Sequence, residues 1–221
     1  MKRLPTILFT VLSLSATASS AQKIMNDAVA TYTISIESVN GEKQISSSLS
    51  GATVTIFLTK DKSRSEMVSA PGTETTVFDN KAGKGFILKE YSGQKLMITT
   101  TSENWAQKNQ INSQLKFETA SGNFNIAGYN CKKATATSAD GKNYTVYYDP
   151  SIVVANTTYN NAFSQLQGLP IQYQLSSGNL VFKYTLNKLS TDVLPAAKFD
   201  APKVGFRVMT YEENQQFKKG E

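Results

Sequence analysis

The sequence predicts a mainly β domain of the β-rich α+β class: a single curved antiparallel sheet, or open half-barrel, of about ten or eleven strands with one to three short helices. Three observations carry this prediction: apolar and polar residues alternate over much of the chain, glycine-containing turns separate the alternating runs, and helical periodicity is scarce. Of the 221 residues, 40% are apolar and 18% are charged, which is the balance of a globular domain. A disordered chain would be less apolar, and a multi-span membrane protein would be more so.

Residues 1–21 have the features of a cleaved secretory signal peptide. Lys2 and Arg3 precede an apolar run, and small residues stand just before the expected cut at Gln22. The apolar run is too short to span a bilayer, although a retained amphipathic or anchor helix is the alternative interpretation. The residue directly after the cut is Gln22 and not a cysteine, so we expect a periplasmic protein that is neither a lipoprotein nor membrane-spanning.

The strands are predicted from a period of two in apolar residues. Over 28–39, 52–60, 171–176 and 180–188, apolar side chains take every second position, which is typical of antiparallel strands with one wet face. The inward positions, which are the candidate lining of a hydrophobic cavity, are Tyr32, Ile34, Ile36, Val54, Ile56, Leu58, Tyr173, Phe182 and Tyr184. Further β-prone runs lie near residues 62–69, 73–79, 85–91, 95–100, 114–119, 123–127, 130–138 and 142–149.

Turn residues indicate that most strands are joined by hairpins into a meander. Asp140-Gly141 stands between two β-prone runs, and Ser92-Gly93 and Ser177-Gly178-Asn179 are further turn signals. No linker or fixed-period repeat is present in the sequence. We therefore predict a single domain over residues 22–210, followed by a polar C-terminal tail over 211–221.

Helix is predicted at three places only. Residues 159–167 place Tyr159, Phe163 and Leu166 on one face, and Gly168 stands where a left-handed C-cap would. Residues 103–110 would make one or two turns around Trp105, and residues 210–213 have the spacing of a capping box. The candidate lid over the core consists of Trp105, Tyr159, Phe163 and Leu166; Trp105 is alternatively a ligand or partner anchor.

The few predicted helices can cover only part of a sheet that is apolar on one face. Each Å² of apolar surface that stays in contact with water loses about 25 cal/mol of stabilisation relative to burial, so the uncovered part of the sheet needs a partner. Either the sheet curls until its inner face packs on itself, or the uncovered part forms a cleft for an apolar ligand. The inward aromatic side chains fit both outcomes, since they would line a hollow or fill it.

The composition offers little for catalysis. The chain has no histidine and one cysteine, which removes the commonest general base, disulfides within the chain and thiolate zinc clusters. We assign no catalytic, cofactor-binding or metal-binding residue and expect no enzyme, with a carboxylate-only hydrolase as the remaining alternative. Cys131 is predicted to be a small buried thiol; an intermolecular disulfide or a thiol activated by Lys132 or Lys133 is the alternative. The net charge of +6 is spread thinly, which argues against nucleic acid as a partner.

Several motifs in order carry a resemblance to a known family. They are Gly128-Tyr129-Asn130-Cys131-Lys132-Lys133-Ala134, the Asp140-Gly141 turn, Tyr144-Thr145-Val146-Tyr147-Tyr148, Gly168-Leu169-Pro170-Ile171-Gln172-Tyr173 and Phe199-Asp200-Ala201-Pro202-Lys203-Val204-Gly205-Phe206. Over roughly residues 22–210 the chain resembles uncharacterised secreted proteins of Gram-negative bacteria related to the GLPGLI proteins, with Ile171 where those have a second glycine. The resemblance implies a half-barrel similar to the periplasmic lipoprotein carriers (LolA-like), with helices over the concave face. That family has no established activity, so it supplies no catalytic residues.

Three functions follow, in order of preference. The first is a secreted, periplasmic, non-catalytic binding or carrier protein that holds a lipid or acyl chain in a cavity on the order of several hundred Å³. The alternative is a cell-envelope protein–protein interaction module with a filled core, which would expose an apolar patch or an unpaired sheet edge. The third, an enzyme, would need clustered carboxylates with shifted pKa values in a cleft.

Overall fold

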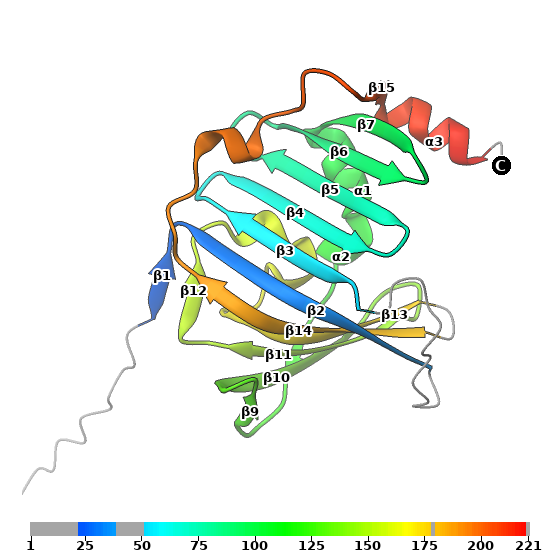
Figure 1. The fold of residues 1–221 in the computed structure, drawn as a ribbon. Coiled ribbons are helices and arrows are strands. Elements are labelled where there is room, and N and C mark those ends of the chain that lie inside the picture. The colour runs from blue at the N-terminus through cyan, green and yellow to red at the C-terminus, as the bar shows by residue number, and fades with distance from the viewer. Residues whose placement is uncertain (1–21, 39–50, 178–179, 220–221) are drawn as a thin grey trace, which may run out of the picture.

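The computed structural model describes residues 22–38, 51–177 and 180–219 (Figure 1). The predicted signal peptide over 1–21 lies outside the described residues, as do Gly178 and Asn179 of one predicted turn and the last two residues of the predicted tail. Within the described part, no helix is long and apolar enough to cross a membrane.

One curved, open sheet of 13 strands dominates the molecule, as the alternation predicted (Figure 1). Its first half is an antiparallel meander of β2 (Ala28–Ser38), β3 (Thr53–Leu58), β4 (Lys62–Ser69), β5 (Gly72–Asp79), β6 (Lys84–Tyr91) and β7 (Gln94–Thr101). The second half contains β10 (Tyr129–Thr137), β11 (Asn143–Asp149), β13 (Leu169–Ser177) and β14 (Leu180–Ser190), with the short strands β8 (Glu118–Thr119) and β9 (Phe124–Ile126) beside β10. The pairing of β14 with β2 joins the two halves.

Two pairings are parallel and were not expected. The strand β15 (Arg207–Thr210) runs parallel to β7 at the edge of the sheet, and β1 (Lys23–Met25) pairs in parallel with β12 (Ile152–Val154). The sheet is therefore not a pure meander. Each of these three strands contains only three or four residues, which is too few for a period of two to be recognised in the sequence.

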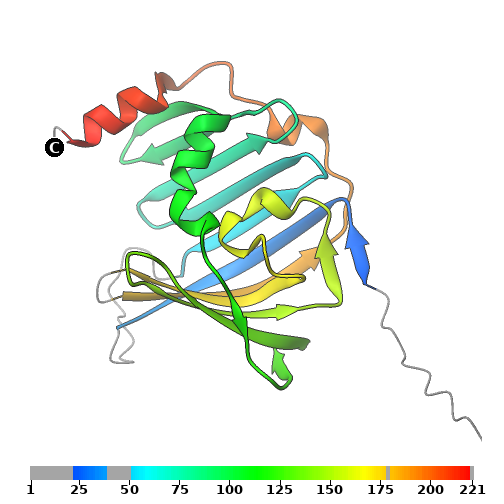
Figure 2. The same ribbon diagram turned by 180° about the vertical axis from the view of Figure 1, so that it is seen from behind.

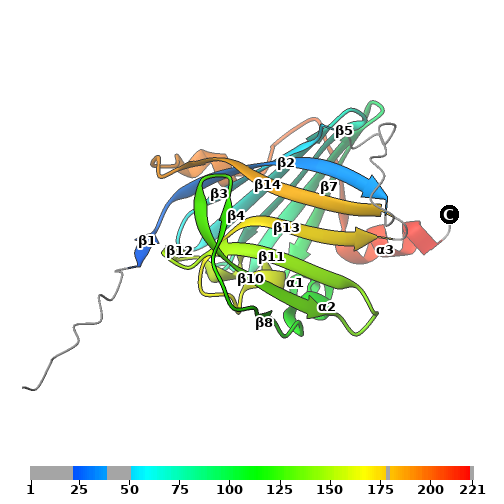
Figure 3. The same ribbon diagram turned by 90° about the horizontal axis from the view of Figure 1, so that it is seen from below.

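The helices α1 (Ser102–Lys108) and α2 (Gln110–Ser113) follow β7 and lie across the concave side of the sheet (Figures 2 and 3). Two 3₁₀ turns, η1 (Thr157–Tyr159) and η2 (Asn161–Phe163), lie next to them. The sheet bends around this group of elements. Helices over the concave face are thus present, as the family resemblance implied.

The helix predicted over residues 159–167 is wrong. Asn160 has an extended backbone and its side chain accepts a hydrogen bond from the Ala162 N–H at 3.2 Å, so a new turn starts where a helix would have continued. Nor does Gly168 act as a left-handed cap. A Cβ atom at this position would lie 2.5 Å from the Asp149 carbonyl oxygen, so glycine is required for close approach to the end of β11.

The turns and caps of the other predicted elements are present. Ser92 and Gly93 both have positive φ in the two-residue loop between β6 and β7, and Gly141 does so in the hairpin between β10 and β11. At the C-terminus, the Thr210 hydroxyl accepts a hydrogen bond from the Glu213 N–H, and the Glu213 carboxylate accepts one from the Thr210 N–H. This capping box starts α3 (Tyr211–Lys219). Its first residue is buried against β6 and β7, so the region predicted as a polar tail begins as part of the packed domain.

The convex face of the sheet is crossed by residues 191–206, which we call the strap. The strap contains the 3₁₀ turn η3 (Ala196–Phe199) and leads from β14 back to β15. Phe199 is buried against Val77, Phe86 and Leu88, which point away from the concave side. Lys198 lies over the Phe57 ring at 4.0 Å from its centroid and contacts the Glu66 carboxylate at 3.1 Å. The strap thus gives the convex face a small second core.

Candidate functional site

The concave face contains a cleft of about 460 Å³. It lies between strands β3–β5 on one side and β11, β13 and β14 on the other, and α1, α2 and η2 reach over it. Its larger lining side chains are Val54, Ile56, Met67, Trp105, Tyr144, Tyr159, Phe163, Tyr173, Leu175 and Tyr184. The smaller and polar ones include Ser63, Ser65, Glu74, Thr76, Asn112, Lys142 and Asn160.

The hollow exists because the middle strands carry small side chains on their concave side. The register places Ser65 between Ile56 of β3 and Thr76 of β5, and it places Ser63 in the next row on the same face. Side chains of this size leave the space above the sheet empty, while the opposite wall is built of large aromatic rings. Alternating polar and small residues in β4 therefore shape the cleft, whereas a row of leucines would have filled it.

Aromatic side chains make up the opposite wall. The Tyr173 and Tyr184 rings are stacked with centroids 4.6 Å apart, and Phe163 meets Tyr173 edge-on at 4.9 Å. Behind them, Tyr32 is 1% exposed and donates a hydrogen bond of 2.7 Å to the Pro170 carbonyl oxygen. Burial raises the pKa of Tyr173 and of Tyr159 well above the ordinary tyrosine value, so both present neutral hydroxyl groups.

The roof of the cleft depends on one stacked pair. The Trp105 ring of α1 lies parallel to Phe78 of β5, with centroids 4.5 Å apart. The helix that carries Trp105 is fixed at its start by a capping box between Thr101 and Asn104, and Asn104 in turn donates to Glu212 of α3 at 2.6 Å. Trp105 is thus held against the sheet at one end of the cleft.

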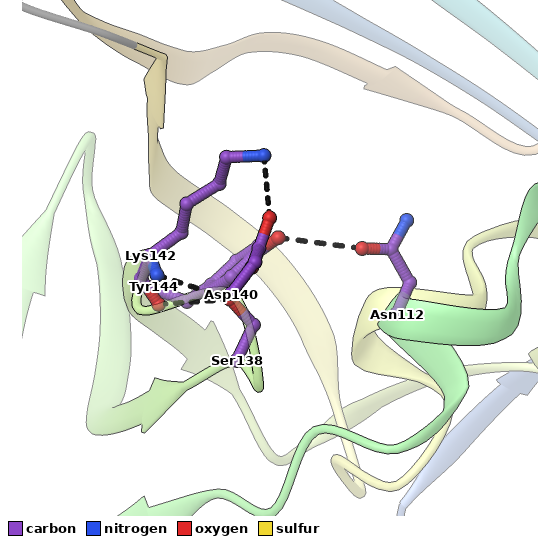
Figure 4. A network of polar contacts seen from close by, with 5 residues as sticks. All are labelled: Asn112, Ser138, Asp140, Lys142 and Tyr144. Carbon is purple, nitrogen blue, oxygen red and sulfur yellow. Dashed lines mark hydrogen bonds and ion pairs between the residues drawn. The ribbon is translucent and has the colours of Figure 1, made fainter.

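The mouth of the cleft is polar and is tied to α2 (Figure 4). Tyr144 donates a hydrogen bond of 3.3 Å to Asn112, which links β11 to the helix. In the adjoining hairpin, Asp140 accepts a hydrogen bond from Ser138 and forms an ion pair of 2.8 Å with Lys142. Across the mouth, Glu74 and Lys89 lie 3.8 Å apart. Lys142 and Glu74 of the lining are therefore paired, and the rest of the lining combines apolar and aromatic side chains with small polar ones.

The predicted site residues divide into two groups. Val54, Ile56, Tyr173 and Tyr184 line the cleft, as do Trp105, Tyr159 and Phe163 of the predicted lid. The others lie elsewhere: Tyr32, Ile34, Ile36 and Leu58 are buried in the core, Phe182 packs against that core, and Leu166 faces a separate small pocket behind η2. Alternation identifies the face of a strand, but it does not tell how far along the strand the hollow extends.

Sequence reasoning missed the residues that make the space. Met67 and Tyr144 line the cleft and lie in runs that were predicted as strands without a face being assigned to them. Leu175 also lines the cleft; it was assigned to the same face as Tyr173 but was not named as a lining residue. The signal for Met67 was its place two residues after Ser65 in a predicted strand, since residues two apart share a face. The small residues of β4 and β5 become meaningful only when the register is known.

The chemistry of the described residues is limited. No group of three or more histidine, cysteine, aspartate or glutamate side chains in the described ranges is arranged to hold a metal ion. Cys131 is 0% exposed, and burial, together with the Asp149 carboxylate, raises the pKa of its thiol to about 11. Neither neighbouring lysine activates it. The cleft therefore offers shape, aromatic surface and neutral hydroxyl groups to a ligand.

No family model and no curated protein sequence matches the chain. Among solved structures, PNGF-II is similar with a TM-score of 0.51 at 14% identity, over 87% of this chain and 33% of that one. The lipoprotein LppX of Mycobacterium tuberculosis is similar with a TM-score of 0.39 at 9% identity, over 77% of this chain and 89% of that one. A LolA superfamily protein of Nitrosomonas europaea is similar with a TM-score of 0.38 at 6% identity, over 82% of this chain and 93% of that one.

The chain spans about a third of the length of the PNGF-II chain, and this likeness shows the fold alone. The expected relation to the GLPGLI proteins stays a prediction. The fold is an open, curved, mainly antiparallel sheet with short helices on its concave side.

Proposed function

We propose that the protein is an exported, periplasmic, non-catalytic carrier that holds an apolar moiety, such as a lipid or an acyl chain, in the concave cleft. The observation that carries this proposal is a hollow of about 460 Å³ under a roof of short helices, in the place where a well-packed domain would have side chains.

The walls of the cleft support an apolar ligand. Val54, Ile56 and Met67, together with the small side chains of β4, form one wall, and stacked aromatic rings from β13 and β14 form the other. Transfer of an alkyl chain from water to the space between these walls is favourable by about 25 cal/mol for each Å² of apolar surface that is buried. The paired charges at the mouth leave a hydrated opening for a headgroup.

The competing proposal, an interaction module with a filled core, is less well supported because its main requirement was the absence of such a hollow. Among the described residues, the large apolar side chains that are exposed lie on several elements; they are Ile24, Val68, Ile111, Val193, Val204, Val208 and Phe217. A catalytic role would require an activated nucleophile or an acid–base pair in the cleft. Burial raises the pKa of Tyr173 and Tyr159, which keeps these two hydroxyl groups protonated.

Native mass spectrometry of the protein purified from the periplasm tests the proposal. We expect a population that carries a non-covalent adduct of lipid mass, and we expect organic extraction to release it and to leave a folded, bare protein. Adding palmitate back to the extracted protein should restore an adduct and change the emission of Trp105, which is the single tryptophan of the chain. A bare mass under all preparations, with no uptake of palmitate, would contradict the carrier function.

A further inference from the structure

The interior of the cleft contains tyrosine hydroxyl groups that the protein leaves without a hydrogen-bond partner. They belong to Tyr159, Tyr173 and Tyr184, which line the cleft and whose hydroxyl groups form no hydrogen bond within the described part of the chain. These hydroxyl groups are not enclosed, because the fully buried side-chain atoms without a partner in the described ranges are those of Thr100 and Asn161. Each of the three is therefore open to the hollow and available to a ligand. We call them the tyrosine cluster.

The members of the tyrosine cluster lie close together. Tyr173 and Tyr184 are directly paired across β13 and β14, and their rings are stacked at an angle of 9°, so both hydroxyl groups extend toward the same part of the cleft. Burial raises the pKa of Tyr173, and the neighbouring Tyr184 and Tyr159 raise it further, as expected for hydroxyl groups that interact electrostatically. The cluster thus presents neutral O–H donors from β13, β14 and η1 at one place.

The opposite wall of the cleft carries further hydroxyl groups of the same kind. Ser63 and Ser65 of β4 and Thr76 of β5 line the hollow, and among the described residues their hydroxyl groups have no hydrogen-bond partner and are not fully enclosed. Hydroxyl groups thus face the hollow from both walls, between apolar side chains such as Val54 and Met67. A plain hydrocarbon chain would displace water from these groups without replacing its hydrogen bonds.

The basic side chains of the lining are already paired. In the described part of the chain they are Lys142, which forms its ion pair with Asp140 at the mouth, and Arg64. The Arg64 guanidinium group binds the Glu66 carboxylate and the Lys198 carbonyl oxygen, and it therefore points to the strap on the convex side. A carboxylate or phosphate deep in the cleft would lose its hydration without gaining a counter-ion. The interior therefore favours an oxygen acceptor that carries no charge.

We propose that the ligand of the cleft is an ester-linked acyl chain, whose carbonyl oxygen accepts hydrogen bonds from the tyrosine cluster while its alkyl part lies between the apolar side chains. This inference rests on the carrier function and names the class of lipid. An ester carbonyl accepts hydrogen bonds and cannot donate one, so it matches a site whose unpartnered groups are hydroxyl donors. A free fatty acid would place its carboxylate at the hydrated mouth, and its binding would not depend on the tyrosine cluster.

Binding of methyl octanoate and nonane to the extracted protein tests this inference. The two probes have the same number of carbon atoms, but only the first has a carbonyl group, and Trp105 emission follows both titrations. In Tyr173→Phe and in Tyr184→Phe, the affinity for methyl octanoate should fall about five- to tenfold, while the affinity for nonane stays the same or rises. Both variants keep the ring and lose a hydroxyl group that has no partner, so they should be at least as stable in urea as the wild type. The matched control is Tyr147→Phe, since Tyr147 packs against Phe124 outside the cleft and should not affect either probe.

Octanoate, the free acid, is the third probe and should bind the wild type and both variants equally. A loss of octanoate affinity as large as that of the ester would place a carboxylate at the tyrosine cluster and overturn the ester assignment. Binding of methyl octanoate that neither variant weakens would retain the carrier function and overturn the role of the cluster. Failure of all three probes, together with a bare mass of the periplasmic protein, would overturn both.

Discussion

A larger side chain on the sheet, placed so that it fills the cleft, should show separately what the empty space contributes to ligand binding and to stability. Ser65 faces the hollow between Ile56 and Thr76, so the ring of Ser65→Phe has space to enter without displacing the sheet. Full burial of a phenylalanine side chain contributes about 1.5–3 kcal/mol, and a ring that stays partly open to the cleft should contribute about 1–2 kcal/mol. Phenylalanine also suits a strand better than serine does.

We therefore expect Ser65→Phe to be more stable than the wild type and to lose the bound lipid. With a urea m-value of about 2 kcal/mol/M, the unfolding midpoint should rise by about 0.5–1 M. Native mass spectrometry on the same samples measures the lipid. The matched control is Thr53→Phe, which places the same ring on the convex face of the neighbouring strand β3 and should keep the ligand. A folded Ser65→Phe variant that retains full lipid occupancy would refute the location of the ligand, and a loss of stability would show that the space is already filled.

Three further predictions concern the core and the contact between the strap and the convex face. Tyr32→Phe removes a buried hydrogen bond to β13 and should lower the free energy of unfolding by about 1–2 kcal/mol in urea titrations without changing lipid occupancy; an unchanged midpoint would contradict this. Cys131 should react with a thiol reagent at pH 8 far more slowly in the native protein than in urea, because its pKa is raised to about 11 and its side chain is buried; equal rates would argue against the burial. Burial raises the pKa of Glu66, but hydrogen bonds from Arg64 and Lys198 outweigh it, so the folded pKa lies below the ordinary 4.5. A depressed folded pKa gives stability that is present above the unfolded value and is lost as pH falls through the folded value. The advantage of the wild type over Glu66→Gln should hence be constant from pH 7 to about pH 5 and shrink below it, and a difference that persists at pH 2 would refute the assignment.

The strands could be predicted because their signal is local. Alternation over β2 and β14 gave both the elements and the face that carries Tyr32 and Tyr184, and the turn at Ser92 followed from backbone requirements of a two-residue loop. The hairpin at Asp140-Gly141 is of the same kind. Where a residue's own neighbours in the sequence decide its structure, the prediction was confirmed.

Two predictions failed in the segment between β12 and β13, one through a local side-chain hydrogen bond and one through a distant contact. The spacing of Tyr159, Phe163 and Leu166 fits a helix, but Asn160 breaks it with a side-chain hydrogen bond that competes with the helical one. Gly168 looks like a cap, yet its reason is contact with the end of β11. The first error thus has a local cause that the spacing of apolar residues did not reveal, and only the second depends on a contact with another strand.

The cleft itself could be predicted only as one of two outcomes. The balance between sheet and helix indicated that the concave face would be hollow or filled, and the sequence of β4 did not decide between them. The decisive fact is that Ser63 and Ser65 lie in register with Leu58 and Ile56, opposite the rings of Tyr173 and Tyr184. Such an arrangement requires strands from both halves of the chain, so no window of the sequence contains it.

The joining of the two halves of the sheet has a consequence for how the molecule forms. The first long strand, β2, pairs with the last long strand, β14, so nearly the whole domain lies between the partners of this ladder. Contact order is therefore high and folding should be slow, since a large loop must close before the ladder is gained. Until β14 has been synthesised, one edge of β2 is free to pair with other chains, and any fragment ending before residue 180 should aggregate for that reason.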